Sequence, residues 1–386
     1  MRKLGLAEAI AALVGTIIGA GVFTLPYVSK ISGLFFSFFW IAIVFFIILF
    51  LHLAFGEIVL RTKENYRLPG YTGYYLGTPA KKFIFITTFL TFSISLLIYL
   101  LLGTHFFELI LKFFSIKSLN FNLIFLFLWL IFNLSILDKS NNLAAKINFY
   151  LSFVLVFLFI IIAVFALPHI KLENFSFFKS ENKIGWLIPY GVFFYALNGA
   201  VAIPEVISIL KKYNLLERTK RVIKIGTFIP FLIYIIFIIS VLGVTGVNTS
   251  KEAISNLEPI LGKSIVFIGA LVGFLAVSTS YLIFATYIKN SFINDFNWTP
   301  FISYLVIILG PIVFYLSGLQ NVIKLISFVG GMIGGLEGIM ILLILKKAKE
   351  KKEIVPSYEI PLNQTLLVVL IIALLLGAFC QTFLVY

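Results

Sequence analysis

Long apolar runs separated by short polar segments dominate this chain, and they predict an all-α protein that crosses a membrane many times. A helix needs about 20 apolar residues to span the hydrocarbon core of a bilayer. Eleven runs meet or approach that length, near residues 6–31, 34–60, 83–111, 121–137, 143–167, 184–210, 222–246, 262–288, 299–316, 321–345 and 364–385. The polar connections are too short to form a separate soluble domain, so we expect one membrane domain over residues 1–386.

Two of these runs carry a glycine and a proline at the same spacing. Gly21 precedes Pro26, and Gly199 precedes Pro204, each with four residues between them. Helices broken at matching places in two halves of a chain indicate a transporter's binding site. Because five runs precede residue 184, the two broken helices enter the membrane from opposite sides. We therefore expect an inverted five-plus-five repeat, with repeat one near 6–167, repeat two near 184–345 and an extra helix at 364–385.

The composition supports a multi-pass membrane protein and narrows the partners. Of the 386 residues, 61% are hydrophobic and 12% are charged, about half the charged share of a soluble domain. The net charge of +14 does not indicate a nucleic-acid partner, because most of the 30 Lys and Arg residues fall in alternate connections. That bias predicts a cell-membrane protein with a cytoplasmic N-terminus and an external C-terminus. The sequence leaves the oligomeric state open.

Cysteine and histidine are too scarce and too scattered for a disulfide framework or a Cys/His metal site. Cys380 is the single cysteine, and the three histidines have no partner at metal-ligand spacing. No cofactor is expected apart from a coupling ion, Na⁺ or H⁺.

A helix break at membrane depth leaves backbone groups that need partners. In the first run, the half before the break ends near Thr16 to Gly19 with free carbonyls, and the next half begins at Ala20 and Gly21 with free N–H groups. A zwitterionic amino acid fits this arrangement, because its carboxylate accepts from N–H groups and its ammonium donates to carbonyls. Tyr195 would border the same pocket. The alternative is that the glycines of the first run serve helix packing.

A sodium site is one hypothesis for coupling. Ser278, Thr279 and Ser280 lie in the eighth run, where their hydroxyls could join carbonyls of Thr16 or Gly19 in an oxygen cage for Na⁺. The alternative is that the hydroxyls bond back to carbonyls of their own helix.

Two acidic residues at membrane depth offer a proton route. Ionisable groups inside a membrane are costly and therefore candidates for function. Glu337 and Glu205 could each carry a coupling proton if burial disfavours the charged carboxylate. Alternatively, Glu205 caps N–H groups at the second break, and Glu337 bonds a neighbouring helix across a glycine-rich surface. We expect His52 and Glu57 to be solvated near the end of the second span.

Four segments resemble one superfamily of transporters. They are GTIIGAGVFTLP (15–26), FGEIVLRTKENYRLPGY (55–71), ALNGAVAIPEV (196–206) and AVSTSYLIFA (276–285). In this order they resemble the amino acid/polyamine/organocation superfamily, in particular its amino acid/auxin and aromatic amino acid permease branches. The likeness covers about the first 290 residues.

This resemblance implies a LeuT-type fold and proton- or sodium-coupled amino acid transport. By analogy, the substrate carboxylate would meet Ala20 and Gly21, and its amine the carbonyls of Ile17, Tyr195 and Asn198. The expected substrate site therefore comprises Thr16, Ile17, Gly19, Ala20, Gly21, Tyr195, Asn198 and Gly199.

The sequence as a whole predicts a secondary active transporter for an amino acid, large and neutral or aromatic, and not an enzyme. A membrane-embedded transferase would need carboxylates or histidines clustered near an interface, whereas here they are dispersed. A channel or receptor on the same fold is the other alternative.

Overall fold

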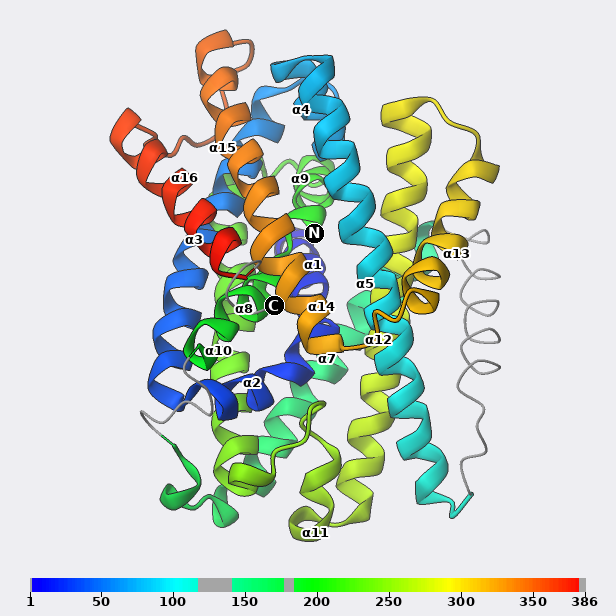
Figure 1. Ribbon diagram of the computed structural model, residues 1–386. Helices are drawn as coiled ribbons and strands as arrows, with labels where there is room; N and C mark the ends of the chain where they lie inside the picture. The colour runs from blue at the N-terminus through cyan, green and yellow to red at the C-terminus, as the bar shows by residue number, and fades with distance from the viewer. Residues whose placement is uncertain (1, 117–140, 177–183, 382–386) are drawn as a thin grey trace.

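The computed structural model describes residues 2–116, 141–176 and 184–381, and all regular structure in these ranges is helical (Figure 1). The main helices are α1 (Arg2–Ile17), α2 (Leu25–Ser32), α3 (Leu34–Arg61), α4 (Leu68–Leu76), α5 (Thr78–Phe113), α7 (Asn141–Ala166), α8 (Ile188–Leu197), α9 (Ile203–Lys212), α10 (Thr219–Thr245), α11 (Glu258–Leu261), α12 (Lys263–Phe296), α13 (Pro300–Leu316), α14 (Val322–Phe328), α15 (Gly334–Lys351) and α16 (Gln364–Phe379).

Ten of the eleven predicted spans correspond to helices. Six spans are long and apolar enough to cross a membrane, and the bent pair α1 and α2 makes a seventh. The other three are shorter apolar helices, at Phe153–His169, Pro300–Leu316 and Gln364–Phe379. The predicted span 121–137 lies outside the described residues.

The two broken helices lie side by side and run in opposite directions. α1 contacts α9, whereas α2 contacts α8, so each half of one broken helix lies beside the opposite half of the other. Figure 1 shows α2 towards the α11 end of the molecule and α9 towards the α4 end. This antiparallel arrangement is the one expected of an inverted repeat.

The helices around the breaks fall into two packed groups. α10 packs against α1 and α3, and α3 also packs against α8. A second group forms around α5 and α12, which contact each other extensively and also contact α13 and α7, respectively. Phe23, immediately after the first break, stacks with Phe106 of α5 at 4.7 Å and with Phe237 of α10 at 6.4 Å between ring centroids. Aromatic packing therefore joins the two groups beside the break.

Glu57 is buried in an ion cluster, so the prediction that it is solvated at an interface was wrong. Its carboxylate accepts from Arg61 Nε at 2.8 Å, Lys349 Nζ at 2.7 Å and the Ile360 N–H at 2.8 Å. The Arg61 guanidinium also bonds the exposed Glu359 and holds the pKa of that carboxyl below its usual range. The cluster fastens α3 to α15 and to the linker before α16.

Candidate functional site

The first break occupies Ile18 and Gly19. α1 ends at Ile17, Gly19 is extended (φ −121°, ψ −152°), and a short 3₁₀ segment (Ala20–Thr24) leads into α2 at a bend of 45°. Pro26 is the second residue of α2, a position where its missing N–H costs no helical hydrogen bond. The proline therefore marks where the second half of the helix starts.

The second break repeats this design. α8 ends at Leu197, Asn198 is extended (φ −74°, ψ 113°), and a 3₁₀ segment (Ala200–Ala202) leads into α9. Pro204 is again the second residue of the following helix. The Asn198 side-chain oxygen accepts the Ala200 N–H at 3.1 Å and so satisfies one of the freed donors.

The two breaks touch, which explains why each carries a glycine. A Cβ atom at Gly21 would lie 3.0 Å from Ala196 Cα, and one at Gly199 would lie 2.5 Å from Ile17 Cγ1. Neither gap accepts a side chain without movement of the other broken helix. The glycines therefore allow the two breaks to pack closely, whether or not they also contact substrate.

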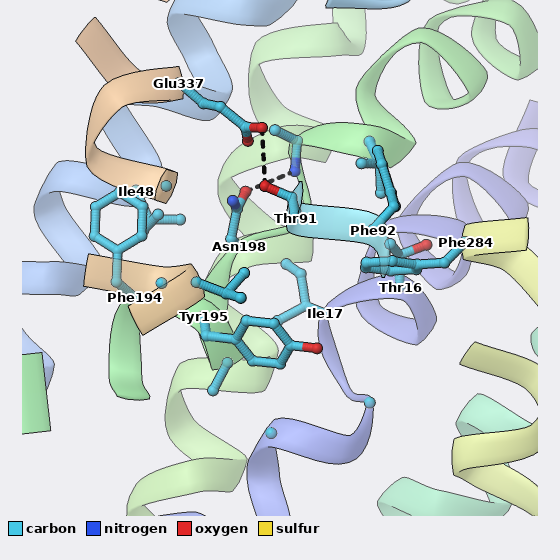
Figure 2. Close-up of a pocket in the computed structure, with 18 of the residues that line it drawn as sticks. Thr16, Ile17, Ile48, Thr91, Phe92, Phe194, Tyr195, Asn198, Phe284 and Glu337 are labelled. Atoms are coloured by element: carbon cyan, nitrogen blue, oxygen red, sulfur yellow. Dashed lines mark hydrogen bonds between the residues drawn. The ribbon is translucent and has the colours of Figure 1, made fainter. Parts of the chain in front are cut away.

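A cavity lies where the breaks meet (Figure 2). Seven of the predicted substrate residues line it, namely Thr16, Ile17, Gly19, Ala20, Gly21, Tyr195 and Asn198. Gly199 is not among the lining residues, and its N–H donates to His52. Its proposed contact with substrate stays a prediction.

The opposite wall comes from α5, α12 and α15, of which only α12 was connected with the breaks from the sequence. It includes Thr88, Thr91, Phe92 and Tyr99 of α5, Phe284 and Tyr287 of α12, and Glu337 of α15. For α5 the sequence contained one indication of a polar face, because Ser and Thr residues recur in the apolar stretch 87–95. Nothing in the sequence said which face of α5 they occupy or what that face meets.

At the first break, some backbone groups are free to bind a ligand, whereas others already have hydrogen-bond partners. The first N–H groups of a helix lack an intrahelical acceptor, and after this break they belong to Ala20 and Gly21, both on the cavity wall. The Ile17 carbonyl already accepts from the Gly19 N–H at 2.9 Å and from the Tyr234 hydroxyl at 2.7 Å. An ammonium could bind Ile17 only by displacing one of these donors, and that role stays a prediction.

Most hydroxyls of the suggested sodium site bond to their own helices. Ser278 donates to the Phe274 carbonyl at 2.8 Å, and Thr279 donates to the Ala276 carbonyl at 3.0 Å. Thr16 likewise donates to the Ala12 carbonyl at 2.9 Å. Ser280 differs, because its Oγ lies 3.0 Å from where a Cβ of Gly19 would be. The Ser280 hydroxyl is therefore placed against the first break.

The two acidic candidates lie in different surroundings. Glu337 faces the cavity and accepts a hydrogen bond from Thr91 of α5 at 3.1 Å (Figure 2). In the described part of the chain, no lysine or arginine forms an ion pair with it. A π-helical turn (Val329–Ile333) separates α14 from α15 shortly before it, and such turns are frequent at functional sites. Glu205 lies in the first turn of α9, exposed and away from the cavity.

Antiparallel helices broken at membrane depth around a shared cavity are typical of secondary transporters. Residues 3–381 match the tryptophan/tyrosine permease family, and the chain belongs to that family. It is therefore a multi-pass membrane protein that transports an amino acid and not an enzyme.

Solved structures agree on the fold. The crystal structure of MhsT in complex with L-phenylalanine is similar, with a TM-score of 0.64 at 13% sequence identity over 97% of this chain and 98% of that one. This similarity confirms the LeuT-type fold. No curated protein sequence matches the chain.

Proposed function

We propose that this permease transports aromatic amino acids, tryptophan and tyrosine before phenylalanine, by alternating access of its two five-helix repeats. The observation that carries the proposal is the cavity at the touching breaks, which combines free N–H groups on one wall with aromatic rings on the other. The free N–H groups suit a carboxylate, and the rings suit a large apolar side chain.

The aromatic wall is a connected cluster. Phe284 of α12 stacks edge-on with Phe92 and Tyr99 of α5, at centroid distances of 5.1 and 5.3 Å, and Phe92 also stacks with Tyr287 at 4.7 Å. Packed rings of this kind favour another ring in an edge-on or offset contact. An indole or phenol side chain would add to the cluster.

The hydroxyl of Tyr195 supports a preference for substrates with a polar side-chain atom. Ser95 and Tyr99 lie beside this hydroxyl, but no group in the described residues reaches it with hydrogen-bond geometry. Thr88 also lines the cavity, and its buried hydroxyl likewise lacks a hydrogen-bond partner among the described residues. A phenol O–H or indole N–H could bond such a group, whereas phenylalanine could not.

Tyr195→Phe should therefore weaken discrimination between tyrosine and phenylalanine by about 5- to 20-fold, the usual effect of one hydrogen bond to a ligand. Counterflow of labelled tyrosine, tryptophan and phenylalanine into proteoliposomes measures this ratio and tests the function itself. Ser93→Ala, whose hydroxyl is buried on α5 but is not on the cavity wall, is the matched control. An unchanged ratio in Tyr195→Phe would remove the specificity claim, and no uptake of any aromatic amino acid would remove the function.

For coupling we infer a proton route through Glu337. An ionised carboxylate with no cationic partner is costly at membrane depth, so proton uptake by Glu337 can accompany substrate entry. Its hydrogen bond to Thr91 and its place on the cavity wall bring the carboxylate close to the substrate. Glu205 is outside the cavity and is better explained by a favourable interaction with the N-terminus of α9.

A sodium route remains the second candidate because Ser280 faces Gly19. If Na⁺ binds there, Ser280→Ala should raise the Na⁺ concentration for half-maximal uptake about 10-fold, since one oxygen ligand is lost. Thr279→Ala is the matched control, because that hydroxyl bonds its own helix, and it should have little effect. Wild-type uptake that does not respond to Na⁺ would exclude this route.

The distribution of charge supports a cytoplasmic N-terminus. The ends of α3, α9 and α15 carry basic residues, including Arg61, Lys211, Lys212, Lys349 and Lys351. Figure 1 places these ends on the same side of the molecule as α4. We assign that side to the cytoplasm by the positive-inside rule. Because α16 begins on that side and runs away from it (Figure 1), we propose that the C-terminus lies outside.

A further inference from the structure

The second break leaves one backbone donor that neither helix satisfies and that does not face the cavity. The Gly199 N–H lies between α8 and the 3₁₀ segment, away from the cavity wall. An unpaired N–H group at membrane depth is costly. Here it donates to Nε2 of His52, at 3.0 Å, on the neighbouring helix α3. The prediction that His52 is solvated was therefore wrong, since its side chain is fully buried.

The partners of His52 determine which ring nitrogen carries the proton. The Asn198 side chain also lies beside the ring, but among the described residues the Gly199 N–H is the group that meets Nε2 with hydrogen-bond geometry, so Nε2 accepts and has no hydrogen. Nδ1 lies 2.9 Å from Thr227 Oγ1, and the Thr227 hydroxyl already donates its one proton to the Ile223 carbonyl at 2.9 Å. Thr227 can therefore only accept from His52. The imidazole is neutral, with its hydrogen on Nδ1.

The face of α10 that carries Thr227 also hydrogen-bonds one carbonyl group from each break, through Tyr234. Tyr234 lies seven residues after Thr227, which places the two side chains on one face of the helix. The Tyr234 hydroxyl lies 2.7 Å from the Ile17 carbonyl and 3.0 Å from the Ala196 carbonyl, and it shares its proton between them. Neither His52 nor Tyr234 is among the described residues that line the cavity. Both side chains therefore hydrogen-bond the breaks without lining the cavity.

We propose that His52 is a positioning residue for substrate binding and that it must accept the Gly199 N–H as a neutral Nδ1–H imidazole. This bond fixes the backbone at 198–199 and thereby the Asn198 side chain and the Tyr195 carbonyl next to it. Removing the acceptor frees the second break to move away from the first. The binding consequence rests on the proposed function, whereas the hydrogen-bond chain Thr227–His52–Gly199 does not.

The binding test compares His52→Leu with His52→Gln. Leucine leaves the Gly199 N–H buried without an acceptor, so the Kd for labelled tyrosine should rise about 10- to 100-fold. The glutamine oxygen can occupy the position of Nε2, so His52→Gln should recover most of that loss. His169→Leu removes an exposed histidine and is the matched control. Wild-type affinity in His52→Leu, or equal losses in both His52 variants with the fold intact, would overturn the proposal.

A spectroscopic test does not depend on transport or on His52 variants. In a His105→Gln, His169→Gln protein, His52 is the remaining histidine, and ¹⁵N NMR of its ring reports the tautomer. We expect a protonated Nδ1 and a bare Nε2. The opposite tautomer would overturn the hydrogen-bond chain even if uptake is normal, whereas the expected tautomer without any amino acid binding would overturn only the proposed function.

Discussion

Gly21→Val should abolish substrate binding while the protein still inserts and folds. A Cβ at Gly21 would lie 3.0 Å from Ala196 Cα and 3.2 Å from Tyr195 Cδ1, and the two methyl groups of valine add to this crowding. The first break must move away from the second, which displaces the N–H groups proposed to hold the carboxylate. Since a hydrogen bond to a charged group is worth about 1.5–3 kcal/mol, losing two of them should lower the affinity at least about 100-fold in an equilibrium binding assay with labelled tyrosine.

The control for crowding alone is a pair of alanine variants. A Cβ at Gly269 of α12 would contact the Ile254 side chain at 3.1 Å, away from the cavity, at a similar distance to the contact at Gly21 but with a side-chain atom in place of the Ala196 Cα. Gly21→Ala should lower affinity, whereas Gly269→Ala should not. Size-exclusion chromatography establishes that each variant is folded. Near-normal uptake by Gly21→Val would contradict the assignment of the first break to the substrate site.

Glu337→Gln should abolish accumulation driven by a pH gradient but preserve exchange of internal for external amino acid. Glutamine keeps the volume and a hydrogen-bond acceptor for Thr91 but cannot take up or release a proton. Net accumulation requires proton movement, whereas exchange does not. Uptake into proteoliposomes with an imposed pH gradient, followed by counterflow without one, measures the two activities separately.

Thr91→Val is the matched control for Glu337→Gln, because it removes the 3.1 Å hydrogen bond and leaves the carboxylate in place. We expect it to keep pH-driven accumulation. If both activities survive in Glu337→Gln, the carboxylate is structural. If both disappear although the protein is folded, Glu337 supports the cavity itself and the proton route lies elsewhere.

Local sequence determined the helices and their breaks, because both depend on neighbouring residues. Apolar runs of membrane length predicted ten spans that the structure describes as helices, some of them broken. The spacing Gly21–Pro26 and Gly199–Pro204 predicted both breaks, because proline is favoured in the first turn of a helix and glycine permits close approach of the backbone just before it. The inverted orientation followed from counting spans.

Tertiary structure alone decided which groups face one another. The polar faces of α3, α5 and α12 could not be assigned from the sequence, because these helices are apolar almost all round and show no clear polar face. His52, 147 residues from Gly199, could therefore not be recognised as its acceptor. The packing of the helices places Thr91 beside Glu337. It also places the Ser280 hydroxyl beside Gly19. The residues at each break follow from the local chain, whereas the partners that satisfy them are fixed by contacts between distant helices.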